Sequence, residues 1–380
     1  MIPVRILIMG AGSAGAENLI RSLRHADPSL VLLGCNDDRF VVRCSEADAG
    51  YLVPAPGSSR FVGTLRRLIR ESRVDLVIPT IDRHVHALSD ARATVHGKVF
   101  LPAPRVIALC RDKCRLISAL RRHGVAAPAT YPLREPRDVD AIFTRLGNPS
   151  RVWCRPRTGT CARGGAAVST PDQARRWMTI WETMQGVPIA DFTLAEYLSG
   201  REILCQSVWQ RGRMVLANTF ERLAYFGADN IPSGVTSLSS LAKTVIEPGV
   251  VKVCQQAIAA VAPGASGAFS VDVKEDVDGR PHVTEINAGR FFMAMTAFDR
   301  VLKHNIALAY VRLALGERVD FGDAYDAVDD YYMVRDMDTE PGVFHADDFF
   351  DDVARRKRSA VHRSTAGTGK ELNDGHGPDC

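Results

Sequence analysis

Asp272-Val-Lys-Glu-Asp-Val-Asp278-Gly279-Arg-Pro-His-Val-Thr-Glu285-Ile-Asn287 is the segment from which the other assignments follow. Its central Asp-Gly pair predicts a β-hairpin with a two-residue turn. Counting outward from that turn places Asp272 directly opposite Glu285, where two carboxylates would repel, and alternation places Asn287 on the same face as Glu285. A solvated edge face would not explain this pairing of acids. Oxygen ligands in this arrangement predict a hard cation, first of all Mg²⁺, which usually arrives with phosphates.

The bulk composition is that of an ordinary globular enzyme. The chain has 380 residues, enough for two or three packed units, with 46% hydrophobic and 24% charged residues. No apolar run is long enough for a membrane span, the start lacks a signal-peptide cleavage region, and nine scattered cysteines fit reduced thiols. We therefore expect a cytoplasmic protein with no membrane partner. The formal net charge is +4, and the basic residues do not form a stripe that would suit nucleic acid, so no nucleic-acid partner is expected.

The order of predicted elements indicates an α/β chain with several parts. Short apolar strands alternate with amphipathic helices at the start, which is typical of a parallel sheet. Longer strands and a hairpin follow, then an acidic stretch and a polar end that cannot form a core. We expect a Rossmann-like domain over 1–108, a second domain over 109–320 with a lid subdomain at about 150–197, an acidic closing segment over 321–352, and a disordered tail over 353–380.

The first strand runs into Gly10-x-Gly12-x-x-Gly15, which matches the dinucleotide-binding fingerprint. Asp37 or Asp38 follows at a suitable distance for a ribose hydroxyl. The same glycines serve any tight turn from a strand to a helix. An NAD(P)-dependent oxidoreductase is therefore one alternative function.

Three further motifs suit a nucleotide, although each has an ordinary alternative. Arg155 precedes a glycine-rich loop, residues 158–165, whose amides could cradle phosphates, and it could also belong to a surface turn. Lys113 could contact phosphates or be a solvated charge on its helix. The segment from Glu196 to Glu202 has a glycine between two strands, and such a hinge can offer backbone groups to a flat base and a carboxylate to ribose hydroxyls.

Taken in order, these motifs resemble the ATP-grasp superfamily over about residues 4–320. The hairpin is similar to that of D-alanine–D-alanine ligase, and the stretch from Arg111 to Asn287 is similar to the carbamoyl phosphate synthase large chain. The resemblance implies an N-terminal parallel-sheet domain, the pre-ATP-grasp domain, followed by an α+β ATP-grasp fold. Arg155 stands where most relatives have lysine, and the glycine-rich loop has fewer glycines in its first half than is usual.

The resemblance also implies a role for each motif residue. The expected ATP contacts are Lys113 and Arg155 at the phosphates, Glu196, Tyr197 and Leu198 at adenine, and Glu202 at ribose. Asp272, Glu285 and Asn287 would hold Mg²⁺, with Mn²⁺ as a substitute. Arg290 would contact the acyl phosphate or the substrate. Arg222, in a long loop predicted over 222–240, would lie near the acceptor.

The activity implied is that of an ATP-dependent ligase that joins a carboxylate to an amine through an acyl phosphate and releases ADP. Its expected partners are small-molecule substrates, amino acids above all, and a homodimer is compatible with the sequence. Besides the oxidoreductase, two alternatives remain: a kinase-like enzyme that releases a phosphorylated substrate, and a nucleotide-binding subunit without ligase activity.

Overall fold

The computed structural model describes residues 3–95, 99–160, 162–231, 233–234, 236, 238–292, 294–336, 340 and 342–348. The tail expected over 353–380 lies outside these residues. Within them, no helix combines the length and the apolar character that crossing a membrane requires. The expected domain boundaries remain predictions.

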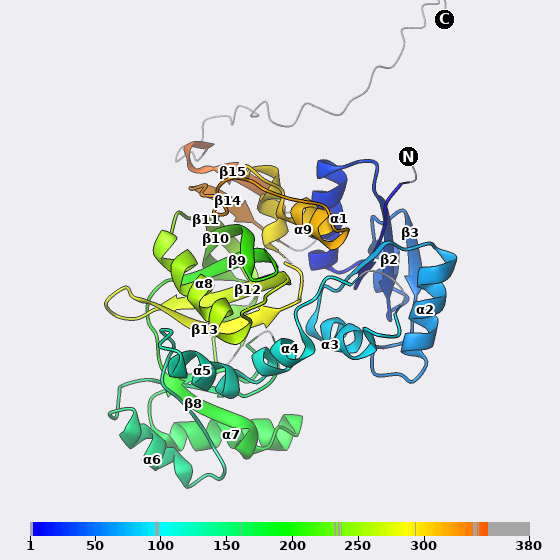
Figure 1. Cartoon of the computed structure of the whole chain (residues 1–380). Helices are drawn as coiled ribbons and strands as arrows, with labels where there is room; N and C mark the ends of the chain where they lie inside the picture. Colours follow the sequence, from blue (N-terminus) through cyan, green and yellow to red (C-terminus); the bar gives the residue numbers. More distant parts are fainter. Residues whose placement is uncertain are drawn as a thin grey trace, which may run out of the picture.

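A four-stranded parallel sheet forms the N-terminal unit (Figure 1). Its strands lie in the order β3-β2-β1-β4, of which all but the partly exposed edge strand β3 are largely buried apolar runs, and amphipathic helices accompany them, as the alternation of strands and helices predicts. The strands are β1 (Arg5–Met9), β2 (Val31–Asn36), β3 (Ala49–Leu52) and β4 (Leu76–Ile78), and the helices are α1 (Ala14–Ala26), α2 (Phe61–Glu71) and α3 (Asp82–Ala91), with the 3-10 helix η1 (Val41–Cys44).

The second unit is built on a seven-stranded antiparallel sheet in the order β13-β12-β9-β10-β11-β14-β15. Odd-numbered side chains of its second and third strands, such as Ile203 and Val271, face helix α8. Even-numbered side chains face the opposite side, where α9 (Ile306–Ala314) and the 3-10 helix η4 (Met295–Arg300) each cover a part and another part lines a cavity. The strands are β9 (Glu202–Gln210), β10 (Arg213–Tyr225), β11 (Ser239–Thr244), β12 (Gly267–Glu275), β13 (Pro281–Ala288), β14 (Tyr331–Val334) and β15 (Gly342–His345).

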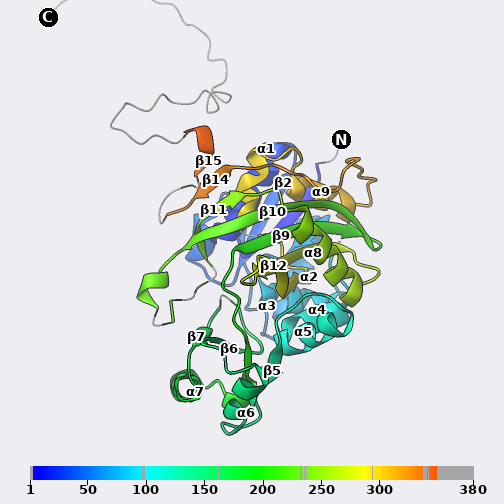
Figure 2. The same ribbon diagram turned by 90° about the vertical axis from the view of Figure 1, so that its left-hand side faces the viewer.

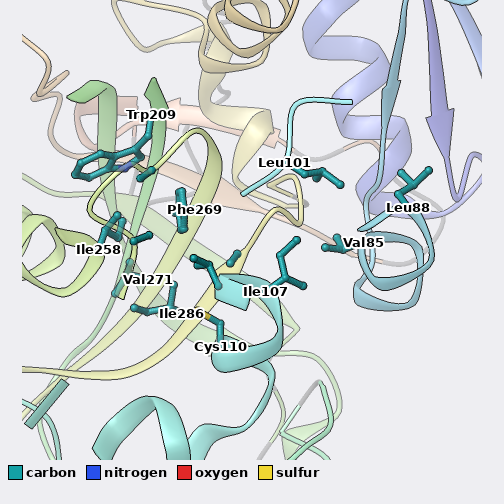
Figure 3. Packing of buried hydrophobic residues seen from close by; sticks show 14 of the residues in the cluster. Val85, Leu88, Leu101, Ile107, Cys110, Trp209, Ile258, Phe269, Val271 and Ile286 are labelled. Carbon is teal, nitrogen blue, oxygen red and sulfur yellow. The ribbon is translucent and has the colours of Figure 1, made fainter. Parts of the chain in front are cut away.

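Helices pack around this large sheet and connect it to the first unit. They are α4 (Pro104–Arg111), α5 (Lys113–Arg122), α8 (Pro248–Val261) and α9 (Ile306–Ala314), with the 3-10 helices η3 (Ala228–Asn230), η4 (Met295–Arg300) and η5 (Ala346–Asp348). Figure 3 shows the shared core, in which Leu88 of α3, Ile107 of α4 and Phe269 of β12 belong to one buried cluster. The two units are therefore joined by a continuous apolar core.

A smaller four-stranded antiparallel sheet, β5-β8-β6-β7, lies beyond α5 at the end of the molecule remote from the N-terminal unit (Figure 2). Its apolar side chains pack against two helices in a separate core. The elements are β5 (Thr130–Pro132), β6 (Val152–Pro156), β7 (Ala166–Val168), β8 (Phe192–Glu196), α6 (Asp138–Arg145), α7 (Pro171–Gln185) and the 3-10 helix η2 (Ile189–Asp191). This sheet carries the glycine-rich loop between β6 and β7.

The hairpin β12–β13 pairs Asp272 with Glu285, as predicted, but its turn was predicted wrongly. Asp276 donates its N–H to the carbonyl of Arg280, so the loop has three residues and Gly279 takes a φ of +77°. This shifts the pairing near the turn by one residue. A β-bulge at Thr284 shifts it back, which restores the predicted pairing at the two acids.

Asp299 of η4 is a buried carboxyl that joins the second unit to α1. It accepts a hydrogen bond from Ser22 Oγ at 2.5 Å. Burial raises the pKa of Asp299 to about 7, although hydrogen bonds to Ser22 and to backbone N–H groups oppose the shift. The folded protein therefore keeps a proton that the unfolded chain releases between pH 4 and 7.

We expect the free energy of unfolding to fall as the pH rises from 4 to 7. The fall is at most about 1.4 kcal/mol for each unit by which the pKa of Asp299 in the folded protein exceeds that in the unfolded chain. Asp299→Asn should remove most of the dependence because the amide does not ionise. Urea denaturation of both proteins at several values between pH 5 and pH 8 measures the effect. Parallel curves for the two proteins would assign the pH dependence to other groups.

Candidate functional site

The site is built on the open face of the seven-stranded sheet. Strand pairing places Arg222, Glu202 and Lys274 in one row across β10, β9 and β12. The next row contains Leu204 on β9, Asp272 on β12 and Glu285 on β13. Because paired residues on neighbouring strands face the same side, these side chains converge on one surface. A third row, Gln206, Ser270 and Asn287, completes it.

The facing acids are accompanied by cations and an amide. Arg222 Nη2 lies 2.7 Å from Asp272 Oδ1, while Lys113 Nζ lies 3.5 Å and Arg155 Nη1 3.8 Å from Glu285 Oε2. Asn287 Nδ2 donates to Asp272 Oδ2 at 2.9 Å. The repulsion between the two carboxylates is therefore offset by three cations from α5, β6 and β10.

The pKa values of the two carboxyl groups are shifted in opposite directions. Burial raises the pKa of Asp272, with Glu285 adding to the shift and Arg222 opposing it. Burial acts in the same direction on Glu285, but Lys113, Arg155 and Arg290 outweigh it and lower the pKa of that carboxyl. Burial thus favours the neutral form of Asp272, whereas the neighbouring cations favour the ionised form of Glu285.

Two of the phosphate-contact candidates are held by backbone carbonyls. Lys113 Nζ donates to the carbonyl of Gly159, in the glycine-rich loop, at 2.7 Å. Arg155 Nη2 donates to the carbonyl of Thr284 at 2.9 Å. Thr284 is the bulged residue, and a bulge takes a residue out of the regular ladder. The bulge therefore makes a carbonyl available that positions Arg155.

The hinge between β8 and β9 carries the adenine and ribose candidates. Two cations lie near the ring of Tyr197, with Arg151 5.6 Å and Lys274 5.9 Å from the ring centroid. Lys274 also pairs with Glu202 at 3.0 Å. A Cβ at Gly200 would lie 2.6 Å from the Cβ of Glu275, so only glycine allows the hinge to approach the hairpin this closely.

Glu196 ends β8 and exchanges backbone and side-chain bonds with Ala129. Leu198 is buried beside it. Arg222, predicted in a loop, lies instead near the end of β10, because that strand extends to Tyr225 and pairs with β11. Arg290 follows β13 and faces Asp82 of α3, with 3.6 Å between Nη1 and Oδ2.

A single cavity of about 900 Å³ brings all the predicted site residues together. It is lined by the eleven side chains Lys113, Arg155, Glu196, Tyr197, Leu198, Glu202, Arg222, Asp272, Glu285, Asn287 and Arg290. Sequence reasoning missed other lining residues, among them Ser13 and Asp82 of the N-terminal unit and Arg335 beyond β14. These come from segments remote in the chain. Ser13 lies within the glycine-rich turn after β1, whereas no local motif marks Asp82 or Arg335.

The donor set around Asp272 and Glu285 fits a hard cation. The Oδ1 of Asn287 is free to join two carboxylates, since its Nδ2 makes the bond to Asp272. Within the described residues no group of three or more His, Cys, Asp or Glu side chains is arranged to hold a metal. Further ligands would have to come from water or from phosphate oxygens, which is usual for Mg²⁺.

The glycine-rich turn of the N-terminal unit is occupied by the chain's own groups. Gly12 donates its N–H to Glu17 Oε1 at 2.6 Å, and a Cβ at Gly12 would lie 1.7 Å from the carbonyl oxygen of Val41. Asp37, a ribose candidate for NAD, forms a two-bond ion pair with Arg83. The turn thus makes contacts within the protein itself, which disfavours the NAD(P)-dependent oxidoreductase.

The arrangement defines a class of protein: a parallel-sheet unit joined to a two-sheet unit that closes over a cavity rich in opposite charges. Solved structures are similar to this chain in fold. An L-amino acid ligase from Bacillus licheniformis matches with a TM-score of 0.65 and 12% identity, over 87% of this chain and 78% of that chain. An N5-carboxyaminoimidazole synthetase from Staphylococcus aureus, complexed with ADP, matches with a TM-score of 0.65 and 13% identity, over 87% of this chain and 82% of that chain.

A third similar structure is the biotin carboxylase domain dimer of the Hydrogenobacter thermophilus 2-oxoglutarate carboxylase, in complex with MgADP, ADP and bicarbonate. Its TM-score is 0.66 at 15% identity, over 87% of this chain and 73% of that chain. No family model and no curated protein matches the sequence. The chain has the ATP-grasp fold, as the order of its motifs predicted.

Proposed function

We propose that the protein is an ATP-dependent carboxylate–amine ligase that releases ADP and phosphate. The observation that carries this proposal is the cluster on the sheet face, where two facing acids and an amide lie among Lys113, Arg155 and Arg222 in one cavity with the hinge. The similarity to ligases and carboxylases that include ADP complexes supports it.

In the proposed reaction, a carboxylate oxygen of the first substrate attacks the γ-phosphorus of ATP. The bond from that phosphorus to the β–γ bridging oxygen breaks, and ADP leaves. An amine then attacks the acyl carbon, phosphate leaves, and the nitrogen loses a proton as the amide forms. Phosphoryl transfer depends on positioning and on neutralising charge more than on covalent help from the protein.

The residues divide this work between them. Lys113 and Arg155 would contact phosphate oxygens, while Glu196, Tyr197 and Leu198 would hold adenine and Glu202 the ribose. Asp272, Glu285 and Asn287 would hold Mg²⁺, or Mn²⁺ as a substitute, and the ion would neutralise phosphate charge. Arg290 and Arg222 would face the acyl phosphate and the acceptor. We further propose a cytoplasmic protein acting on small molecules, amino acids above all, with a homodimer as its assembly.

A screen for ADP release over amino acids, singly and in pairs, with mass spectrometry of the products, tests the proposal. We expect ADP release to require an acid and an amine together and to yield a product joined by loss of water. ADP with one acid and no amine would favour the kinase-like alternative. Binding of ATP without ADP release from any pair would favour a silent nucleotide-binding subunit.

A further inference from the structure

One part of the cavity is not used by the proposed nucleotide and metal contacts. It lies where the N-terminal unit meets the loop after β13, and its wall includes Ile81, Asp82 and Arg290. Backbone contacts fix that loop. Gly289, with a φ of +84°, donates its N–H to the carbonyl of Ala268, and Phe291 donates its N–H to the carbonyl of Pro79. This wall is therefore preformed.

Asp82 and Arg290 both have unused hydrogen-bonding capacity. The side chains are 28% and 22% exposed, and the 3.6 Å between their charged atoms is longer than a hydrogen bond. Within the part of the chain that the structure describes, this contact is the one ion pair of either residue, and neither side chain makes a hydrogen bond. Each group can thus accept a ligand of opposite charge.

The positions of the two charged side chains would fix the orientation of a ligand bound between them. Arg290 lies on the side of the metal candidates, because it follows β13 only three residues after Asn287 and lines the same cavity. Asp82 lies on the side of the N-terminal unit, at the first turn of α3. A ligand carboxylate at Arg290 would therefore face the phosphates, and a cationic group of the same ligand would meet Asp82.

The rest of this wall is apolar. Phe291, Phe292 and Met295 line the cavity beside Arg290 and are almost fully buried. Phe291 packs against Phe292 at 4.8 Å and edge-on against Tyr310 at 4.9 Å between ring centroids, so its position is well supported. A ligand here would place an apolar side chain against this surface.

We propose that Asp82 and Arg290 form the subsite for an α-amino acid with an apolar side chain, whose carboxylate is the one activated. Asp82 binds its ammonium group, Arg290 binds its carboxylate, and Ile81, Phe291, Phe292 and Met295 surround its side chain. This inference rests on the proposed ligase function and names its acyl donor. A bicarbonate ion, bound in the biotin carboxylase domain described above, has no ammonium group for Asp82.

Binding in the presence of saturating MgADP tests the subsite without any need for turnover. Calorimetric titrations would compare L-alanine, L-leucine and L-phenylalanine with propanoate, 4-methylpentanoate and 3-phenylpropanoate, which lack the ammonium group. For the wild-type protein we expect at least one amino acid to bind about 10- to 100-fold more tightly than its partner acid, as expected for hydrogen bonds between charged groups.

Asp82→Asn should lose most of that preference. Its affinity for the amino acid should fall about 10- to 100-fold, while its affinities for the matched acid and for MgADP stay unchanged. Asp90→Asn is the matched control, because Asp90 is an exposed acid on the same helix that does not line the cavity. If Asp82→Asn fails to fold, the affinities of the wild-type protein for amino acids and for their matched acids still test the subsite.

Equal binding of amino acids and their matched acids by the wild-type protein would overturn the inference, as would an equal loss of both in Asp82→Asn. A wild-type protein that binds MgADP and none of the amino acids would also overturn it. The ligase function is judged separately by ADP release. Amino acids that bind through Asp82 without causing ADP release would contradict the ligase and leave the subsite supported.

Discussion

Glu285→Gln is expected to lower ATP turnover by about 100-fold or more, because a neutral amide cannot replace a carboxylate opposite Asp272 in holding a divalent cation. Glutamine keeps the shape of the side chain, and Glu285→Ala should lose activity in the same way. The fold should persist, since the strand pairing of β12 with β13 does not depend on this side chain. ADP release and thermal unfolding, measured on the same preparations, check both parts of the expectation.

Asp278→Asn is the control for this substitution. Asp278 lies in the turn of the same hairpin and makes an exposed ion pair with Arg280, so its loss should change turnover little. Glu285→Gln with wild-type turnover would remove Glu285 from the set of metal ligands. A large fall in its melting temperature would assign the lost activity to unfolding instead.

Lys113→Met is expected to weaken ATP binding by about 10- to 100-fold, in the range for a lost hydrogen bond to a charged group. The lysine is the first residue of α5, is buried, and lies close to Glu285, so it would face the phosphates beside the metal. Its substitution also removes the bond to the carbonyl of Gly159. Titration with ATP under non-hydrolysing conditions, followed by fluorescence or calorimetry, gives the affinity.

Arg115→Met serves as its control, because Arg115 is an exposed cation in the same helix, outside the cavity. Unchanged affinity in Arg115→Met together with a loss in Lys113→Met would locate the effect at the site. Equal, small losses in both would mean that Lys113 acts only through the general positive charge of α5.

The eleven residues that local motifs singled out all line one cavity, and most of them lie on neighbouring strands or on one hinge, while their roles stay predictions. Asp272 and Glu285 are close in the chain, and so are Glu196 and Glu202, so their placement could be predicted from period-two alternation and turn chemistry. The pairing of Asp272 with Glu285 was nevertheless reached through two errors that cancel, a turn longer by one residue and an unforeseen bulge.

The remaining features depend on contacts between distant segments. Arg222 was placed in a loop because β11, its strand's partner, has a weak pattern of its own and pairs with β14 nearly a hundred residues further on. Asp82 reaches the cavity only because the loop after β13 docks on the end of β4. Such docking is decided by packing across the whole core, which no window of sequence contains.

The bulge at Thr284 separates the hairpin into two halves with independent registers. The half next to the turn can change its length or its loop type while the bulge absorbs the offset, and the acids stay opposite each other. Homologous chains could therefore vary in this turn without losing the ion-binding pair, and a short peptide tag could be inserted there. By contrast, deletion of Thr284 itself would remove the bulge and its carbonyl contact to Arg155, although Asp272 and Glu285 would still face each other in a regular ladder.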